Sequence, residues 1–373
     1  MATFLIKSRA GRRSLIDELI ELTAQSLGQL EIQEHFNIVK EIGRGKYGKV
    51  LLVTHRFRGT PMALKVMPKA STKLQGFLRE YCISLHLSCH PCIVGLFGIA
   101  FQSNEHYCFA QELVIGRDLF AVIQPKVGIP ESSAKRCVLQ IASALEFIHS
   151  HGLVHRDVKP ENILLLDNRC CQVKLADFGL AQKRGTLIRY IMGTLPYMSP
   201  ELCTVALMEG QKEVTAPPLS VEPSLDTWAF GVVIFCILTG YFPWECCLDS
   251  DDCYQEFADW MSPPLWKRFT PEAMEMFGKL MALDVRKRCT VGGSETCAQH
   301  VCKKTSTYPC LIPSLRHHVT LFEVRTKPFV QSPSESSVSP VLSGCRWPCW
   351  NGRPKLGLQP EHRWPPILLY RLY

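Results

Sequence analysis

The segment His155–Asn162, which reads HRDVKPEN, places several chemically active side chains within eight residues. Asp157 is a potential base, Lys159 is a cation and Asn162 offers an amide oxygen to a metal ion. A carboxylate within hydrogen-bond reach of a hydroxyl can receive its proton during a reaction. So short a string also arises by chance in surface loops, so its meaning depends on the elements around it.

A predicted β-hairpin follows this segment directly. Ile163–Leu166 and Val173–Leu175 are short apolar runs with an Asp-Asn turn between them. Asp157 and Asn162 precede the hairpin and Asp177 follows it, about 20 residues after Asp157. Because a hairpin returns to its own start, we expect these three oxygen-bearing side chains to converge on one cleft. Hard oxygen ligands suit Mg²⁺ that bridges phosphates.

A glycine cluster, GRGKYGKV at residues 43–50, lies between two predicted strands, Phe36–Ile42 and Val50–Thr54. Glycines let the backbone close over phosphates without obstruction by side chains. A dinucleotide-binding fold needs a helix after its glycines, so the second strand argues against that fold. Lys65 ends the apolar run Met62–Lys65, a third predicted strand, and is a point charge that could reach phosphates.

Helical periodicity marks three further segments. Residues 14–32 alternate acids with Leu and Ile and predict a helix that Ser14 could cap. We favour packing of this helix on the following domain over a dimerising coiled coil, since two heptads are too few for the latter. Thr72–Leu87 predicts a second helix, and Glu131–Ser150 a long amphipathic one that stops before Gly152.

The bulk composition predicts an intracellular protein with a sizeable core. The chain has 373 residues, of which 46% are hydrophobic and 20% charged, with a net charge of +8. This charge shows no clustered basic stripe, so we expect no nucleic-acid partner. The apolar run Met1–Ile6 is too short for a signal peptide, and Trp228–Leu238 is too short to cross a membrane. We therefore expect no membrane association and a cytoplasmic location.

The 18 cysteines are expected to be reduced thiols. Cysteine-rich secreted domains are short and loop-dominated, unlike this chain. The adjacent pairs Cys170-Cys171 and Cys246-Cys247 have poor geometry for ordinary disulfides or tetrahedral zinc. The spacings at Cys297–Cys302 and Cys345–Cys349 resemble metal sites only loosely.

From about residue 36 to about residue 291 the motifs together resemble a protein kinase, and they occur in the expected order. The resemblance implies an α+β, bilobal protein-kinase fold, with a small β-rich lobe bearing one main helix and a large, mainly helical lobe. The Lys159-Pro160-Glu161 sequence and Thr194 resemble the serine/threonine class. The runs Trp228–Glu245, Arg268–Thr270 and Phe77–Tyr81 resemble the SH3-binding-domain kinase family.

This resemblance implies roles for individual residues, with ATP and Mg²⁺ as cofactors. Asp157 would receive the proton of a Ser or Thr hydroxyl, Lys159 would neutralise the γ-phosphate, and Lys65 would orient the α- and β-phosphates, held by Glu80. Asn162 and Asp177 would hold Mg²⁺. The residues expected at the nucleotide are Ile42, Gly43, Gly45, Gly48, Val50, Ala63, Lys65, Gln111, Glu112, Val114, Asp118 and Leu164.

Some features depart from the kinase pattern. Glu80 follows Lys65 sooner than is usual, which leaves the register of its helix insecure. Gln111 occupies the gatekeeper position, where it is an uncommon residue, and its alternative role is a strand residue facing solvent. Ser199 replaces the usual Ala in the Pro200-Glu201 motif. The alternative function is therefore a pseudokinase or scaffold that binds nucleotide weakly or not at all.

The activation segment contains Thr186, Tyr190 and Thr194 and ends near Glu201. Tyr190 stands where a phosphothreonine is usual in kinases, and Thr186 is the other acceptor. We favour a segment ordered without phosphate, with the cations at 183, 184 and 189 free, over phosphorylation of Tyr190. In the resemblance, Arg288 pairs with Glu201 and Asp226 anchors a central helix below the catalytic loop. About a dozen extra residues between Glu201 and Asp226 are expected to form an exposed loop, with shaping of the substrate groove as the alternative.

Three parts are expected along the chain. Residues 1–35 form an N-terminal extension, residues 36–295 the kinase domain (small lobe 36–112, large lobe 116–295), and residues 296–373 a tail without periodicity that we expect to be disordered. The tail has ten scattered prolines but no clean PxxP motif, so SH3-domain partners are only weakly predicted. We expect a monomer that acts on protein substrates.

Overall fold

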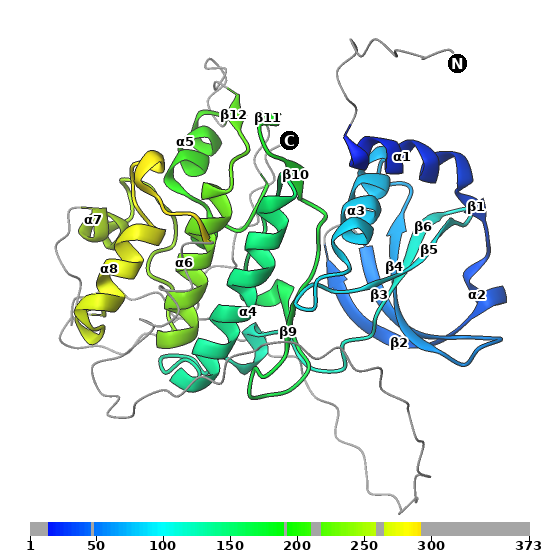
Figure 1. Ribbon diagram of the computed structural model, residues 1–373, viewed down its shortest axis with the longest axis horizontal. Helices are drawn as coiled ribbons and strands as arrows, with labels where there is room; N and C mark the ends of the chain where they lie inside the picture. The colour runs from blue at the N-terminus through cyan, green and yellow to red at the C-terminus, as the bar shows by residue number, and fades with distance from the viewer. Residues whose placement is uncertain (1–13, 46–47, 190–191, 210–217, 259–264, 292–373) are drawn as a thin grey trace, which may run out of the picture.

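The computed structural model describes residues 14–45, 48–189, 192–209, 218–258 and 265–291. These residues form a small lobe around one β-sheet and a larger, mainly helical lobe, side by side in Figure 1. The predicted two-lobed α+β fold is confirmed. The tail expected at 296–373 lies outside the described residues.

One mixed sheet forms the small lobe, with strand order β1-β5-β6-β4-β3-β2. β1 runs parallel to β5, and the other neighbours are antiparallel. Val53, Leu64 and Val66 are fully buried beneath the sheet, as alternating strand positions require. The strands are β1 Gly28–Gln29, β2 Phe36–Gly45, β3 Gly48–His55, β4 Pro61–Pro68, β5 Leu96–Gln102 and β6 His106–Gln111.

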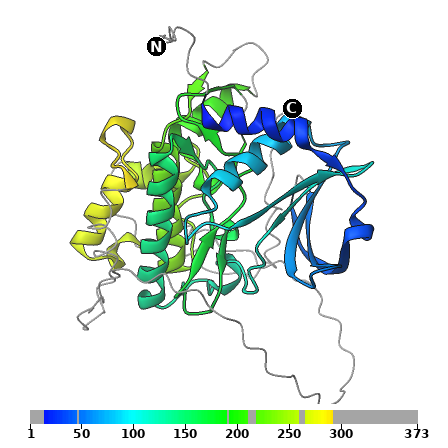
Figure 2. The same cartoon turned by 45° about the vertical axis from the view of Figure 1, so that its right-hand side comes forward.

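The helices of the small lobe are α1 (Leu15–Ser26), α2 (Ile32–His35) and α3 (Leu74–Leu87). Phe77 of α3 is buried and stacks on Tyr107 of β6, which joins the helix to the sheet. Figure 2 shows α1 lying next to α3 and at an angle to it, in agreement with the contact between the two helices. The preferred expectation for the first helix, packing on the following domain, is confirmed.

The extent predicted for this first helix, residues 14–32, was wrong. The helix ends at Ser26, and Leu27 is already extended. Gly28 and Gln29 then pair with Phe101 and Gln102 as an edge strand. The apolar positions keep their helical spacing through Leu30. Gly28 nevertheless disfavours a longer helix, and the chain gains the hydrogen bonds of the sheet edge instead.

The large lobe is built around α6 (Ser224–Thr239), which is buried at every residue from Leu225 to Thr239. Such uniform burial suits a central helix surrounded by others on all sides. Gly240 ends it in the left-handed conformation at φ 71°, where a Cβ would approach the backbone of Gln124 to 2.4 Å. The other helices are α4 Glu131–Ser150, α5 Pro200–Glu209, α7 Asp252–Ala258 and α8 Pro271–Leu280.

Short strands and single 3-10 turns connect these helices. The predicted hairpin is present as β8 paired with β9, while β7 pairs with β10 and β11 with β12. The strands are β7 Leu153–Val154, β8 Ile163–Leu165, β9 Val173–Leu175, β10 Gln182–Lys183, β11 Leu187–Ile188 and β12 Leu219–Ser220. The 3-10 turns are η1 Phe120–Val122, η2 Pro160–Asn162, η3 Leu195–Tyr197, η4 Trp266–Arg268 and η5 Val285–Lys287.

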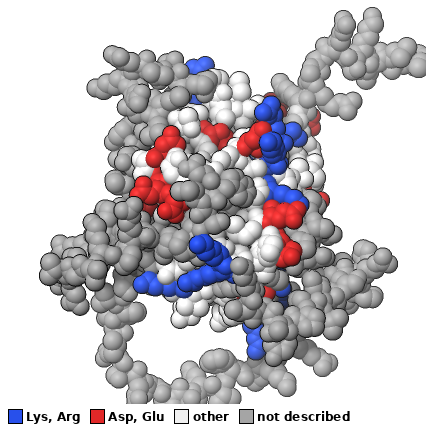
Figure 3. Space-filling model, turned by 90° about the vertical axis from the view of Figure 1, so that its left-hand side faces the viewer, with Lys and Arg blue, Asp and Glu red and all other residues white. Residues whose placement is uncertain are grey.

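The surface on the side of α7 and α8 carries acidic and basic side chains in separate small groups (Figure 3). Among the helices of the described residues, none is long and apolar enough to span a membrane. None of the cysteines in the described ranges forms a disulfide. The same ranges contain no cluster of three or more His, Cys, Asp or Glu side chains that could hold a metal ion. The cysteines at 297, 302, 345 and 349 fall outside them.

Candidate active site

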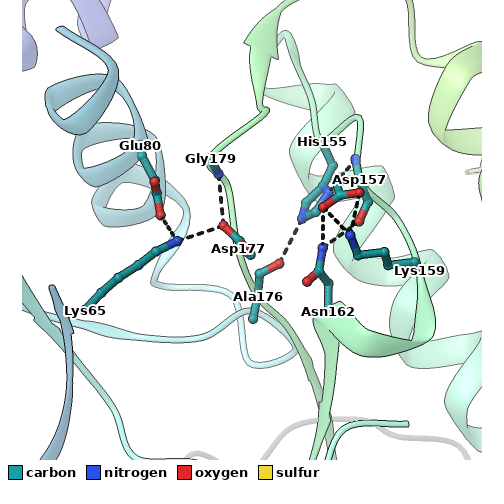
Figure 4. A network of polar contacts seen from close by, with 9 residues as sticks. All are labelled: Lys65, Glu80, His155, Asp157, Lys159, Asn162, Ala176, Asp177 and Gly179. Carbon is teal, nitrogen blue, oxygen red and sulfur yellow. Dashed lines mark hydrogen bonds and ion pairs between the residues drawn. The ribbon is translucent and has the colours of Figure 1, made fainter. Parts of the chain in front are cut away.

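Lys65, Glu80 and Asp177 meet where the two lobes face each other (Figure 4). The Nζ of Lys65 lies 2.5 Å from Oε1 of Glu80 and 2.9 Å from Oδ1 of Asp177. Glu80 is buried in the second turn of α3, which begins at Leu74. The short spacing between Lys65 and Glu80 therefore still brings the two side chains together.

The charges of these three side chains shift one another's pKa values. The ammonium group of Lys65 lowers the pKa of Asp177 to about 2, so this carboxylate is ionised at neutral pH. Burial acts to lower the pKa of Lys65, but Asp177 and Glu80 raise it on balance. Burial raises the pKa of Glu80, and Lys65 opposes that shift. The side chain of Asp177 is 47% exposed and thus open to a ligand.

Asp157, Lys159 and Asn162 form a second cluster opposite the triad (Figure 4). The Nζ of Lys159 donates to both carboxylate oxygens of Asp157, at 3.0 and 2.9 Å. The Nδ2 of Asn162 donates to Oδ2 of Asp157 at 2.9 Å and to its backbone carbonyl at 2.8 Å. The amide nitrogen of Asn162 is thereby occupied on the loop, which turns its oxygen toward other ligands. Lys159 also lies 3.3 Å from Oγ1 of Thr194 in the activation segment.

The catalytic loop is anchored from below by Asp226 of α6. Its carboxylate accepts the backbone N–H groups of His155 and Arg156, at 2.8 and 2.7 Å, and the Nε2 proton of His149. Burial acts to raise the pKa of Asp226, but these hydrogen bonds and the nearby His149 hold it below its ordinary value. The structure thus places Asp226 as the resemblance implied. His149 was not predicted. It lies 77 residues before Asp226 in the sequence, and only the fold brings the two side chains together.

The hairpin β8–β9 returns Asp177 to the catalytic loop. The Nε2 of His155 donates to the carbonyl of Ala176, and the ring of His155 packs edge-on against Phe178 at 4.9 Å. Phe178 is buried, and Asp177, two residues after the end of β9, has a positive φ of 63° and a carboxylate that contacts Lys65. The predicted convergence of Asp157, Asn162 and Asp177 is therefore observed.

The residues expected at the nucleotide are distributed over the small-lobe sheet, the segment that follows it and β8. Lys46 and Tyr47 of the glycine cluster are outside the described residues. The other expected positions fall on β2 (Ile42, Gly43, Gly45), β3 (Gly48, Val50), β4 (Ala63, Lys65), the end of β6 and the segment after it (Gln111, Glu112, Val114, Asp118), and β8 (Leu164).

Two of these residues have partners that the sequence did not suggest. The carboxylate of Glu112 accepts the N–H of Gly95 at 2.6 Å and pairs with Lys174 of β9 at 2.7 Å. It therefore ties the connection between the lobes to the hairpin. The Oδ1 of Asp118 accepts the N–H of Ala121 at 2.8 Å and so caps a turn. Gln111 is half-buried at the end of β6, opposite Ala63.

Gly116 was also missed by the sequence reasoning. A Cβ at this position would come within 1.7 Å of the carbonyl oxygen of Leu165. The segment between the lobes therefore lies against β8 at a distance that only glycine permits. The signal in the sequence was a lone glycine in a loop, which has no distinctive spacing.

The activation segment is held by pairing on two sides. β11 pairs with β12, and Arg184 binds Glu222 at 2.8 Å. Lys183 binds Asp17 of α1 at 2.5 Å. The expectation that Lys183 and Arg184 are free was wrong, because carboxylates far along the chain reach both. The exposed loop expected before Asp226 is in part the strand β12, and residues 210–217 are outside the described ranges, as is Tyr190.

Beyond this segment, Glu201 and Arg288 form the predicted ion pair at 2.7 Å. Thr186 accepts the N–H of Val221 through its carbonyl, and Thr194 is near Lys159 as described above. Ser199 is buried, and its hydroxyl has no hydrogen-bond partner within the described residues. A methyl group would fit that environment without this cost, in keeping with the Ala that is usual there.

Comparison with known proteins agrees with this geometry. The protein kinase domain family matches residues 36–304. The chain is similar to serine/threonine-protein kinase SBK1 of Danio rerio, with 50% identity over 285 residues, 75% of this chain and 72% of that protein. It is 46% identical to serine/threonine-protein kinase SBK2 of Mus musculus over 286 residues, 74% and 77% of the two chains. Serine/threonine-protein kinase meng-po of Drosophila melanogaster is 32% identical over 265 residues, 69% and 56% of the two chains.

Proposed function

Because this chain belongs to the protein kinase family, we propose that the groups converging between its lobes carry out phosphoryl transfer from ATP to protein hydroxyls. The chain is a serine/threonine protein kinase, like the SBK1 and SBK2 proteins that it matches. The observation that carries the proposed mechanism is the contact of Lys65 with both Glu80 and Asp177. It places a fixed cation and a carboxylate opposite the Asp157 loop (Figure 4).

We assign nucleotide binding to residues of the glycine strands β2 and β3 and of β8. Lys65 would orient the α- and β-phosphates, and Glu80 would keep its ammonium group in place. The strand backbone at Gly43, Gly45 and Gly48 would cover the phosphates. The backbone of residues 112–114 would pair with the adenine edge.

The residues present fit Mg²⁺. Asp177 offers an ionised, half-exposed carboxylate, and Asn162 offers an amide oxygen because its nitrogen is bonded to Asp157. Oxygen donors of this kind are the ligands that Mg²⁺ prefers. When bound, Mg²⁺ would neutralise negative charge on the phosphates. Asp177 and Asn162 would hold it at the junction of the two clusters.

Asp157 is the group that would receive the proton of the attacking hydroxyl. Its carboxylate is oriented by two donors, Lys159 and Asn162, so it is fixed before the substrate arrives. Lys159 stands beside it and would neutralise charge on the transferred phosphoryl group. Since little covalent chemistry is left to the protein in such a transfer, positioning of these charges is its main contribution.

The acceptor class is tested with peptides. Purified protein is incubated with Mg·ATP and a degenerate peptide library that offers Ser, Thr or Tyr at a fixed position. We expect phosphate on Ser and Thr peptides, because Lys159 next to Asp157 and Thr194 shape the serine/threonine form of the site. Transfer to Tyr peptides alone would contradict the assignment.

The second test measures nucleotide binding by thermal denaturation. Mg·ATP at 100 times its dissociation constant is expected to stabilise the wild-type protein by about 2.7 kcal/mol. In Asp177→Asn, the part of the Tm shift that depends on Mg²⁺ should disappear, because the ionised ligand is lost. Asp249→Asn, at an exposed position on the large lobe, removes the same charge and should keep the full shift. A wild-type Tm that Mg·ATP does not change would favour the pseudokinase alternative.

Three further assignments stay proposals from the sequence. They are the boundaries at residues 35/36 and 295/296, a cytoplasmic monomer, and SH3-domain partners that bind the tail. The kinase family supports protein substrates as partners. SH3 binding has the weaker support, since the tail has no clean PxxP repeat.

A further inference from the structure

Helix α1 packs against α3, the helix that carries Glu80 (Figures 1 and 2). Ile16 is 6% exposed and belongs to the same buried cluster as Ile83 and Leu87 of α3. These two positions follow Glu80 by three and seven residues, so all three share one face of α3. Helix α1 therefore contacts the same helix that positions Glu80 against Lys65.

A polar contact and further apolar side chains extend this interface. The Sγ of Cys82 in α3 lies 3.5 Å from Oγ1 of Thr23 in α1. Leu19 and Ile20 pack against two separate buried clusters, one of which contains Phe77 and the other Ile83. Helix α1 therefore packs against both of these buried clusters.

The start of α1 also contacts the activation segment of the large lobe. Asp17 binds Lys183 of β10, and Ser14 donates a hydrogen bond to the same carboxylate. The preceding residue of β10, Gln182, pairs with Val154 immediately before the catalytic loop. Asp17 and Lys183 are 46% and 35% exposed, so the pair orients the two elements more than it stabilises them.

The far end of α1 is fixed to the sheet. Gly28 and Gln29 extend the sheet beside β5, and the N–H of Leu30 donates to the carbonyl of Gln102. The helix is therefore held at one end by the activation segment and at the other by the small-lobe sheet. A segment fixed in this way limits the movement of α3 away from Lys65.

We propose that α1 is a built-in positioning element of the kinase, in which Ile16 and Asp17 hold the Glu80 helix and the activation segment in the arrangement that aligns Lys65. This inference rests on the proposed function, because its purpose is to align the triad for phosphoryl transfer. Ile16 and Asp17 touch neither substrate nor nucleotide, so they are positioning residues that act through α3 and β10.

The first test compares a truncation at a buried position of α1 with one at an exposed position. Ile16→Ala removes the buried contact, and Leu22→Ala changes a side chain that is 63% exposed. Circular dichroism verifies the folded fraction of each variant. Ile16→Ala is expected to lower kcat about tenfold with little change in KM for ATP, because α3 holds Glu80 at Lys65 in fewer molecules. Ile16→Val should restore most of kcat, and Leu22→Ala should match wild type. An unchanged kcat in Ile16→Ala would overturn the proposal.

The charged contact is tested on the same turn of the helix. Asp17→Asn is expected to lower kcat about twofold, a small effect because the pair is exposed to solvent. Glu18→Gln removes the same charge from an exposed position and should have no effect. Equal kcat values for the two variants would show that Asp17 has no positioning role, and the proposal would then depend on the apolar contact of Ile16 only.

Hydrogen exchange separates this inference from the proposed function. Amides of residues 77–87 are expected to exchange faster in Ile16→Ala than in Leu22→Ala, whereas amides of α8 exchange alike in both. This readout needs no catalysis. If the wild type transfers no phosphate, the proposed function fails, and the exchange of α3 still decides whether α1 positions it.

A covalent link between the helices provides a rescue. In Ile16→Ala combined with Thr23→Cys, diamide would oxidise the thiols at positions 23 and 82 to a disulfide, with two hydrogens taken up by the diamide. The cross-linked protein should regain kcat and lose it again after reduction, while Ile16→Ala treated alike should not respond. Failure to cross-link would contradict the packing of Thr23 on Cys82, and a cross-linked protein without rescue would contradict positioning.

Discussion

Replacing Asp157 by Asn is expected to lower kcat for phosphoryl transfer by about 10²–10⁴-fold, the usual contribution of a group that takes up a proton in the transition state. The amide has nearly the shape of the carboxylate but no charge to accept that proton. It also places an NH₂ group against the donors Lys159 and Asn162, so one of their hydrogen bonds must be lost. The measurement is the initial rate of phosphate transfer at saturating Mg·ATP.

Binding and chemistry are separated in this variant by two controls. Stabilisation by Mg·ATP should persist in Asp157→Asn, because Lys65, Asp177 and their contact are not altered. Asp249→Asn makes the same substitution at an exposed position and should keep the wild-type rate. Equal rates for Asp157→Asn and wild type would refute the assignment of Asp157 as the proton acceptor.

The parts of the site that the sequence predicted are those that local spacing determines. Asp157, Asn162 and Asp177 are separated by a loop and a hairpin, and pairing of Ile163 with Leu175 is enough to bring them together. The helix Glu131–Ser150 was also predicted to the residue, because its apolar residues recur at helical spacing and Gly152 follows its end. The residues that carry such a signal lie within about 20 positions of one another in the sequence.

The parts that could not be predicted depend on contacts between distant segments. Lys183 is paired because α1 brings Asp17 to it from the start of the chain, and Glu112 because the hairpin brings Lys174. Neither carboxylate has a distinctive spacing to its partner. The end of α1 at Ser26 was missed for the same reason, since the strand β1 exists only where β5 offers its edge.

Glu80 lies between these two cases. The resemblance to kinases identified it, but the short distance from Lys65 in sequence left the helix register insecure. The structure resolves this because Phe77 and Tyr81 of α3 are buried with Phe109 of the sheet. That packing fixes the rotation of the helix, and the rotation directs Glu80 to Lys65.

Arg288→Met is expected to lower the free energy of unfolding by about 3–5 kcal/mol, the cost of breaking a buried ion pair on one side. The side chain of Arg288 is fully buried and donates to both carboxylate oxygens of Glu201, at 2.7 and 3.2 Å. It also donates to the carbonyls of Ser224 and Ala282 and lies over the ring of Trp228. Methionine fills part of this volume but leaves the carboxylate and two carbonyls without their donor. Urea denaturation followed by tryptophan fluorescence gives the change.

Two companion variants test whether the unpaired carboxylate is the cause. Arg288→Lys keeps the charge but not the two-pronged geometry, so its loss should be smaller than that of Arg288→Met. In Arg288→Met combined with Glu201→Leu, no charge is left without a partner, so the double variant should be more stable than Arg288→Met alone. A double variant whose loss equals the sum of the two single losses would show that the ion pair is not the source. Because Glu201 lies in the first turn of α5 and Ser224 begins α6, the pair joins the end of the activation segment to the central helix of the large lobe. Its loss should therefore also weaken the support of Thr194 beside Lys159, and kcat should fall in Arg288→Met even where the protein remains folded.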